Sequence, residues 1–321
     1  MTDTLTRPPF DPELAAALEL IREQMPQTFT AELIPALRGG MTGSEVPALL
    51  DERGIEYRDV AIPGHDGDEI VVTVIHRRGR TGTGPGIYHT HGGGMIIGDR
   101  WMGVTGFLDL IEQHNAVVVT VEYRLAPEFP DPYPVEDCYA GLVWTGEHAA
   151  ELGIDPDRLI IGGGSAGGGL AAGTALLARD RRGPALAGQL LMCPMIDDRD
   201  TSVSTAQIDG VGVWDRGSNV TGWTALLGDR RGTDDVSIYA APARATDLSG
   251  LPPAYIDCGS AEVFRDEDVA YATALWAAGV QAELHVWAGG FHGFDGLAPQ
   301  AALSQAAIAA RESWLARVLG V

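Results

Sequence analysis

The chain has 321 residues, 45% of them hydrophobic, which is enough for one large domain with a sizeable core. Its formal net charge of −22 repels nucleic acid and anionic membrane surfaces, so we expect neither as a partner. All 22 basic residues are arginine, which excludes a lysine Schiff base, a lysine general base and a Walker-type phosphate loop.

Three cysteines, Cys138, Cys193 and Cys258, lie far apart in the sequence. A sparse, odd set is typical of buried thiols in a reducing compartment, without a disulfide framework. The first twenty residues have no basic region followed by an apolar one, and no apolar run is long enough to span a bilayer. We therefore expect a soluble cytoplasmic protein.

Apolar runs of strand length alternate with helix-like segments along most of the chain. The expected strands are residues 55–62, 69–76, 86–90, 116–122, 158–162, 189–193, 254–258 and 282–287. The expected helices are residues 11–25, 104–114, 135–151, 167–182, 267–279 and 299–319. This alternation predicts an α/β fold with a mostly parallel sheet and helices on both of its faces.

The alternation is interrupted at residues 201–235, a segment rich in glycine, serine and threonine that contains two tryptophans. We interpret this segment, together with residues 1–50, as a cap or lid. The main α/β domain then comprises residues 51–200 and 236–321.

The stretch "IIGGGSAGGG" joins a strand-like run to a helix-like run and matches two motifs. Gly162, Gly164 and Gly167 satisfy G-x-G-x-x-G, which binds dinucleotides. Gly163, Ser165 and Gly167 satisfy G-x-S-x-G, which presents a nucleophilic serine. The dinucleotide motif normally has an acidic residue about 20 positions further on, at the end of the next strand. The candidate there lies 30 positions beyond the last glycine, which disfavours a nucleotide site.

A serine on a tight strand-to-helix turn needs small neighbours two positions away on either side, and Gly163 and Gly167 meet that need. Upstream, "HTHGGGMIIG" has three glycines after a strand, whose backbone N–H groups can converge on an oxyanion. His89 and His91 in this stretch could also pair on a metal. No further ligand cluster lies nearby in sequence, so no metal is expected.

A nucleophile elbow predicts the chain order serine, acid, histidine. His285 lies within a strand-like run, whereas His292 lies in the glycine-flanked loop "AGGFHGF", so His292 is the expected partner of the serine. The acid must come from "YIDCGSAEVFRDED", where Asp257 lies in a strand and Glu262 in a loop, whereas Asp266, Glu267 and Asp268 form a helix-start cluster.

These motifs together resemble the hormone-sensitive-lipase-like branch of the α/β-hydrolases, and more narrowly small bacterial acetyl-type esterases. The resemblance runs from about residue 70 to 320 and rests on "HGGGMIIG", "VEYRLAPE", "GGGSAGGGLAA" and "FHGF". It implies an α/β-hydrolase fold with a small cap. It also suggests a homodimer paired through the edge strand "AELHVW".

The resemblance implies a role for each motif residue. The nucleophile would be Ser165, the general base and acid His292, and the oxyanion donors the backbone amides of Gly93, Gly94 and Ala166. The family's usual acid is an aspartate in D-P-L-x-D, but the aligned stretch here is "EVFRD", which places Glu262 at that position. Glutamate reaches ~1.5 Å further than aspartate. Asp266 stays as an alternative acid.

The expected function is a serine esterase that hydrolyses small, short-acyl carboxylic esters through an acyl-enzyme, with no metal or organic cofactor. An amidase or deacetylase with the same triad is an alternative. A ligand-binding member without turnover is a further one, disfavoured because serine, histidine and acid are all present. Five apolar residues could line the substrate cavity or pack in the core: Met95, Ile96, Trp101, Trp214 and Trp223.

Overall fold

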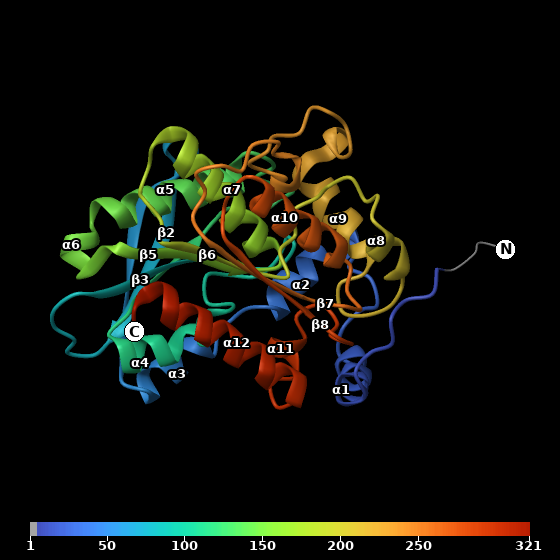
Figure 1. Cartoon of the computed structure of the whole chain (residues 1–321), viewed down its shortest axis with the longest axis horizontal. Helices are drawn as coiled ribbons and strands as arrows, with labels where there is room; N and C mark the ends of the chain where they lie inside the picture. The colour runs from blue at the N-terminus through green and yellow to red at the C-terminus, as the bar shows by residue number, and fades with distance from the viewer. Residues whose placement is uncertain (1–4) are drawn as a thin grey trace.

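The computed structural model describes residues 5–321 and contains one eight-stranded sheet in the order β1-β2-β4-β3-β5-β6-β7-β8 (Figure 1). Its strands are β1 Ile55–Pro63, β2 Glu69–Arg77, β3 Gly84–Thr90, β4 Val117–Glu122, β5 Ile154–Gly164, β6 Gly188–Met192, β7 Ala254–Gly259 and β8 Ala282–Trp287. β1 pairs antiparallel with β2, and β2 with β4, whereas every other neighbouring pair is parallel. The mostly parallel sheet expected from the sequence is confirmed.

Helices cover both faces of the sheet, as expected (Figure 1). One face carries α5 Tyr133–Glu147, α7 Ala166–Arg181 and α10 Arg265–Ala277, and the other carries α3 Val46–Glu52, α4 Leu108–His114 and α12 Ala302–Leu319. The remaining α-helices are α1 Pro12–Arg22, α2 Ile34–Gly40, α6 Ala149–Leu152, α8 Val203–Gln207, α9 Arg216–Leu227 and α11 Phe294–Leu297.

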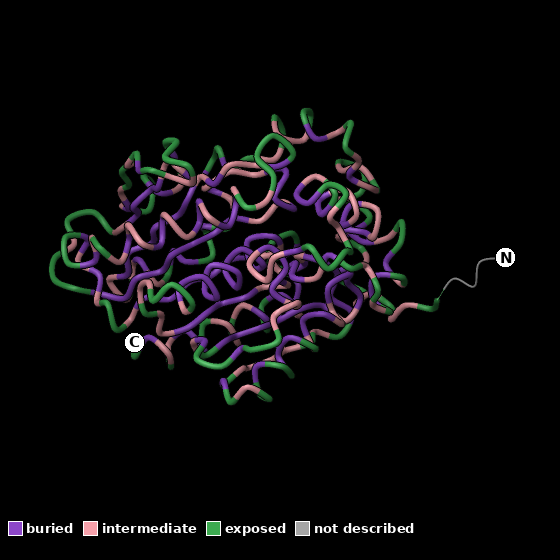
Figure 2. The backbone as a smooth tube through the Cα atoms, turned by 90° about the horizontal axis from the view of Figure 1, so that it is seen from above, coloured by how far each residue is buried: buried purple, intermediate pink, exposed green. Residues whose placement is uncertain are grey.

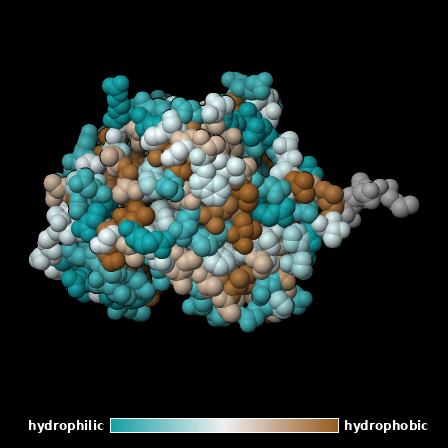
Figure 3. Space-filling model, in the orientation of Figure 1, coloured by the Kyte–Doolittle hydropathy of each residue, from teal (hydrophilic) through white to brown (hydrophobic). Residues whose placement is uncertain are grey.

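The central strands are buried on both faces because successive side chains point to opposite sides of a strand. On β3, Ile87 packs with α4 and α12, whereas Tyr88 packs with α5 and α7. Ile160 and Ile161 of β5 divide in the same way. Figure 2 shows the result as a buried interior beneath exposed turns. The face in Figure 3 is mainly hydrophilic, with apolar residues in small patches.

The insertion and the N-terminal segment lie against each other beside the carboxyl ends of the strands. The hydroxyl of Thr28 donates to Asp215 Oδ2 at 2.7 Å, and the backbone N–H of Phe29 donates to Ser218 Oγ at 2.9 Å. Asp215 also caps the N-terminus of α9 by accepting from the N–H of Ser218. One aspartate thus starts the helix of the insertion and joins it to the N-terminal segment.

Not all of the N-terminal segment belongs to that layer. Val46 and Leu50 of α3 lie in the same apolar cluster as Leu108 of α4 and Trp314 of α12, on a face of the main sheet. Residues 1–4 of the expected cap lie outside the described residues. Among the helices of the described chain, none is both long enough and apolar enough to cross a bilayer.

The topology brings together segments that lie far apart in the sequence. β3, β5, β7 and β8 are parallel, so the loops that follow them all emerge at one edge of the sheet. These loops carry the glycine segment, Ser165, Glu262 and His292, respectively. The carboxyl edge of an open α/β sheet is where such folds place their sites.

Candidate active site

Ser165 lies on a strained turn between β5 and α7, with φ 58° and ψ −125°. Its backbone N–H donates to the Met192 carbonyl of the neighbouring strand at 2.8 Å, which fixes the turn. A Cβ at Gly163 would collide with the backbone of Thr90, and so would a Cβ at Gly167. The two glycines therefore provide the clearance that the sequence analysis predicted for an elbow.

The structure brings three of the expected site residues into one hydrogen-bonded chain. His292 Nε2 lies 2.9 Å from Ser165 Oγ, and His292 Nδ1 lies 3.3 Å from Glu262 Oε2. Glu262 and His292 are buried, whereas Ser165 is partly open. The ring of Phe264 packs edge-on against the imidazole, with 5.1 Å between ring centroids. The imidazole is thus held on two sides and directed at the serine.

The loops carrying Glu262 and His292 are joined through their backbones. The N–H of Ala261 donates to the Gly290 carbonyl at 3.0 Å, and a Cβ at Gly259 would collide with the backbone of Gly290. Two glycines at this crossing let the loops approach closely. The acid and the histidine are thus positioned by one rigid junction.

The other candidates for acid and histidine face elsewhere. Asp266 accepts from the N–H of Ser204 at 2.8 Å and from Arg265 Nε at 2.7 Å, so both of its oxygens are engaged away from the imidazole. Asp257 accepts from an arginine of α12. His285 lies on β8, with Nε2 3.1 Å from Glu283 Oε1.

The glycine loop after β3 lies beside Ser165. The backbone N–H groups of Gly93 and Gly94 have no acceptor within residues 5–321, and Gly93 adopts φ 108°, which favours glycine. Ala166 is the first residue of α7, where backbone N–H groups lack a partner in the preceding turn. The indole of Trp214 packs directly on Gly94, where a side chain would collide with it.

A cavity of about 250 Å³ opens over the serine. Its lining combines the glycine loop after β3, Ser165 and His292 with apolar side chains of the two segments expected to form the cap: Met25, Phe29, Met41, Val213 and Trp214. Of the five apolar residues left open by the sequence, only Trp214 lines this cavity; Met95, Ile96, Trp101 and Trp223 are core residues. The N-terminal lining residues have no motif, so the sequence did not reveal them.

With this geometry established, comparison with known proteins identifies the family. Residues 87–296 match the family described as alpha/beta hydrolase fold. The chain belongs to this family. The match spans the glycine loop, the serine elbow, the acid and the histidine. It confirms the fold and the expected resemblance to the hormone-sensitive-lipase-like branch.

Several relatives of this α/β-hydrolase are named as esterases. It is 37% identical to the carboxylesterase NlhH of Mycobacterium tuberculosis over 88% of this chain and 87% of that protein. The arylesterase of Saccharolobus solfataricus is 31% identical over 90% and 93% of the two chains. Among solved structures, a bacterial heroin esterase is 40% identical with a TM-score of 0.88, over 97% of this chain and 98% of that one. The expected enzyme class, a carboxylic ester hydrolase, is confirmed.

Within the part of the hydrolase that the structure describes, one group of side chains could hold a metal ion. Ligand atoms of Cys193, Glu262 and His292 lie within 4.8 Å of one another. Glu262 and His292 also belong to the hydrogen-bonded chain of side chains that ends at Ser165. His89 and His91, considered as a pair from the sequence, are not part of this group. Burial, followed by the Glu262 carboxylate, raises the pKa of the Cys193 thiol well above its usual value, which disfavours a thiolate ligand or nucleophile.

Further acids of the hydrolase lie buried near Glu262. Burial raises the pKa of Asp268 well above its usual value, and the carboxylates of Glu262, Glu267 and Asp257 raise it further. The Cys258 thiol opposes these effects. No nitrogen or oxygen donor among residues 5–321 is hydrogen-bonded to either carboxyl oxygen of Asp268. A neutral carboxyl at this position is therefore favoured.

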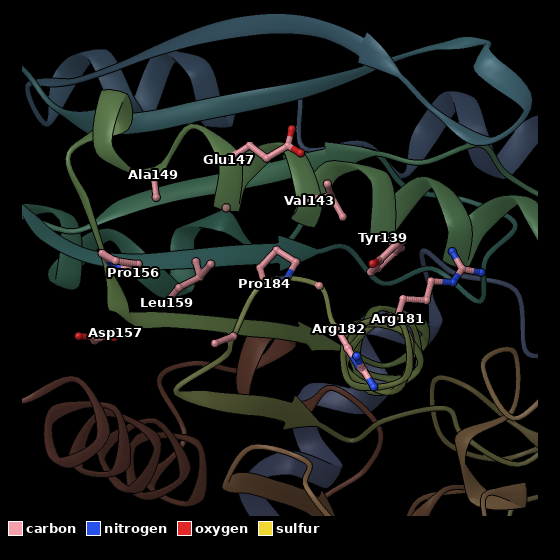
Figure 4. A pocket seen from close by; sticks show the side chains of 13 residues that line it. Tyr139, Val143, Glu147, Ala149, Pro156, Asp157, Leu159, Arg181, Arg182 and Pro184 are labelled. Atoms are coloured by element: carbon pink, nitrogen blue, oxygen red, sulfur yellow. The ribbon is translucent and has the colours of Figure 1, made fainter.

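A second cavity, of about 510 Å³, lies at the amino end of β5, between α5 and the turn that follows α7 (Figure 4). Its thirteen lining residues include no serine, cysteine or histidine. Ser165 and His292 instead line the cavity at the opposite end of the strand.

Proposed function

We propose that the chain is a serine esterase in which Ser165 is the nucleophile, His292 the general base and acid, and Glu262 the triad acid. The observation that supports this most directly is the 2.9 Å contact between His292 Nε2 and Ser165 Oγ, with Nδ1 of the same ring facing Glu262. A base must lie within hydrogen-bond reach of the proton it removes, and this geometry meets that requirement.

In the first half-reaction, Ser165 Oγ attacks the ester carbonyl carbon while its proton passes to His292 Nε2. The N–H on Nδ1 is donated to Glu262, which holds the ring in the required tautomer and stabilises the imidazolium. The carbonyl oxygen develops a negative charge, and it accepts hydrogen bonds from the backbone N–H groups of Gly93, Gly94 and Ala166. Each such donor contributes about 3 kcal/mol to transition-state stabilisation.

The leaving alcohol takes the proton from His292 Nε2 as the tetrahedral intermediate collapses to an acyl-Ser165. A water molecule then loses a proton to His292 and attacks the acyl carbon, which releases the acid and restores the serine. All proton transfers use one nitrogen of His292, so Glu262 needs only to hold the ring in place.

The proposed substrates are small carboxylic esters with short acyl groups. A cavity of about 250 Å³ is smaller than the ~300–1,000 Å³ typical of drug-sized ligands, which supports a small substrate. The Trp214 indole and the Phe29 ring lie 5.3 Å apart by centroids and bound the space from the cap side. The proposal includes a cap formed by the N-terminal segment and residues 201–235, a cytoplasmic location, and a homodimer paired through β8.

The test is hydrolysis of a p-nitrophenyl ester series of increasing acyl length by the wild type and by Ser165→Ala. Loss of the nucleophile should lower kcat by about 10³- to 10⁶-fold, because only binding and oxyanion stabilisation remain. Ser313→Ala, an exposed serine on α12, is the matched control and should keep full activity. Equal activity of Ser165→Ala and wild type would overturn the proposal. Faster turnover of acetanilides than of acetyl esters would instead identify an amidase.

A further inference from the structure

The cavity above Ser165 is lined by apolar groups except at a few points, and one of these is the ring of His89. His89 is the penultimate residue of β3, three positions before Gly92, and only 1% of it is exposed. The mechanism proposed above uses no atom of this ring. Its hydrogen bonds determine what the ring presents to the cavity.

Two contacts fix the tautomer of His89. The hydroxyl of Thr120 donates to the Arg100 carbonyl at 2.7 Å, since a carbonyl oxygen can only accept. A hydroxyl has a single proton, so Thr120 Oγ1 must accept from His89 Nδ1, which lies 3.0 Å away. The proton of the neutral ring therefore resides on Nδ1, and Nε2 carries a lone pair.

The lone pair on Nε2 has no hydrogen-bond donor within residues 5–321, and the atom is not sealed from solvent-accessible space. It points toward Gly103, where an added Cβ would lie 3.1 Å from Nε2, and Gly103 also lines the cavity. The ring of Phe107 packs edge-on against the imidazole, with 5.5 Å between centroids. Its direction is thus fixed by packing as well as by Thr120.

The ring also stays neutral. Burial, and secondly the neighbouring His91, lower the pKa of His89 to about 3. Nε2 therefore remains a hydrogen-bond acceptor at every pH at which a serine–histidine pair works. Once bound substrate has displaced water from this acceptor, free energy is lost unless the substrate supplies a donor.

We propose that His89 Nε2 is a substrate-recognition subsite that accepts a hydrogen bond from a hydroxyl group of the ester, so that the enzyme prefers hydroxylated esters to their alkyl isosteres. The subsite rests on the proposed function, because it selects the substrate of that same serine. A site with a positioned acceptor disfavours an analogue that lacks the donor, since the acceptor then stays unpaired. The hydroxyl comes from the acyl or from the alcohol part of the ester.

The test compares isosteric esters that differ by hydroxyl against methyl. One pair is p-nitrophenyl 3-hydroxybutyrate and p-nitrophenyl 3-methylbutyrate, which tests the acyl part. The other is 2-hydroxyethyl butyrate and propyl butyrate, which tests the alcohol part. We expect kcat/KM to favour the hydroxyl member by about tenfold or more in one pair. Preference for the methyl member in both pairs, or no preference in either, would overturn the subsite.

His89→Phe removes the acceptor and keeps an aromatic ring, so the hydroxyl preference should disappear. His285→Phe makes the same change on β8, outside the cavity, and should leave the preference unchanged. A preference that survives in His89→Phe would assign it to another group. If His89→Phe fails to fold, nitrogen-15 NMR of the wild-type histidines decides the tautomer, and an Nε2-protonated ring would overturn the proposal.

A separate measurement distinguishes this failure from failure of the proposed function. In Ser165→Ala, calorimetric binding of each ester pair reports the subsite without turnover. Absence of esterase activity in the wild type, together with hydroxyl-selective binding in Ser165→Ala, would overturn the proposed function and keep the subsite. Esterase activity without selective binding or turnover would do the reverse.

Discussion

The carboxylate that faces His292 comes from the longer of the two acidic side chains. Glu262 Oε2 lies 3.3 Å from Nδ1, whereas its Oε1 is buried with no partner among the described residues. This single contact leaves one carboxyl oxygen of Glu262 unfixed. The ring orientation therefore depends on a single carboxyl contact together with packing by Phe264.

We predict that Glu262→Ala lowers kcat/KM for short-acyl esters by about 10²- to 10⁴-fold, because the tautomer and the imidazolium lose their partner. Asp266→Asn is the matched control. Its oxygens are engaged by Ser204 and Arg265, so activity should stay within a few-fold of wild type. Steady-state kinetics of both variants decide between the acids. A large loss in Asp266→Asn with little loss in Glu262→Ala would make Asp266 the triad acid.

How far the sequence predicts a residue depends on whether its role is local. Ser165 and His292 follow from motifs whose glycines serve the same short turn or loop. Phe29 reaches the cavity only through hydrogen bonds to the insertion nearly 190 positions away, which no local pattern encodes. The sequence indicates His89 only as half of a possible metal pair. The recognition role that we propose for it depends on a contact with Thr120 on the neighbouring strand, which no local motif encodes.

At the scale of elements, strand identity and direction were predictable, but strand order was not. Alternating apolar runs predict parallel strands, yet β4 lies between β2 and β3, a crossover that depends on which faces are buried together. In the insertion, the glycine- and serine-rich composition does not indicate a helix, so α9 was not predicted. That helix forms because Asp215 caps it and because Trp223 and Leu226 are buried against the main domain.

The edge strand β8 carries the dimer prediction. An edge presents unpaired backbone groups, and Val286 on β8 is 42% exposed, so two chains can pair there. Sedimentation velocity of the wild type should give the mass of two chains. A charged lysine on an edge strand disfavours pairing with a second strand, so Val286→Lys should sediment as a monomer. The control is Val203→Lys: Val203 is the first residue of α8 and is 54% exposed, and this variant should stay dimeric. A wild-type monomer at all concentrations, or a dimeric Val286→Lys, would contradict pairing through β8.

At the scale of the whole molecule, some of the many acidic side chains lie in the buried interior. Asp268 and Glu267 lie at the start of α10, in the interior, and burial raises the pKa of both well above the usual range. Glu267 accepts hydrogen bonds from the backbone N–H groups of Ile196 and Asp197, which offset part of the free-energy cost of burying its carboxyl group. Asp268 has no such partner within the described chain. Glu262 thus lies beside two carboxyls whose own protonated state is favoured by burial.

We predict that Asp268→Asn makes the stability of the protein less dependent on pH. The folded state holds a proton on Asp268 at pH values where the unfolded chain, with a pKa of about 3.9, has lost it. Between the unfolded-chain pKa of about 3.9 and the raised folded-state pKa, Asp268 therefore lowers the free energy of unfolding by ~1.4 kcal/mol for each unit of rising pH. Asparagine imitates the neutral carboxyl and does not titrate, so this part of the slope disappears.

Chemical denaturation from pH 5 to pH 9 measures the slope, which is independent of any constant packing change that the substitution causes. The stability of Asp268→Asn relative to wild type should therefore increase as the pH rises. Asp234→Asn, an exposed acid in the insertion, is the matched control and should keep the wild-type slope. Parallel curves for Asp268→Asn and wild type would mean that Asp268 is ionised in the folded protein. Glu262 would then lie beside a buried negative charge.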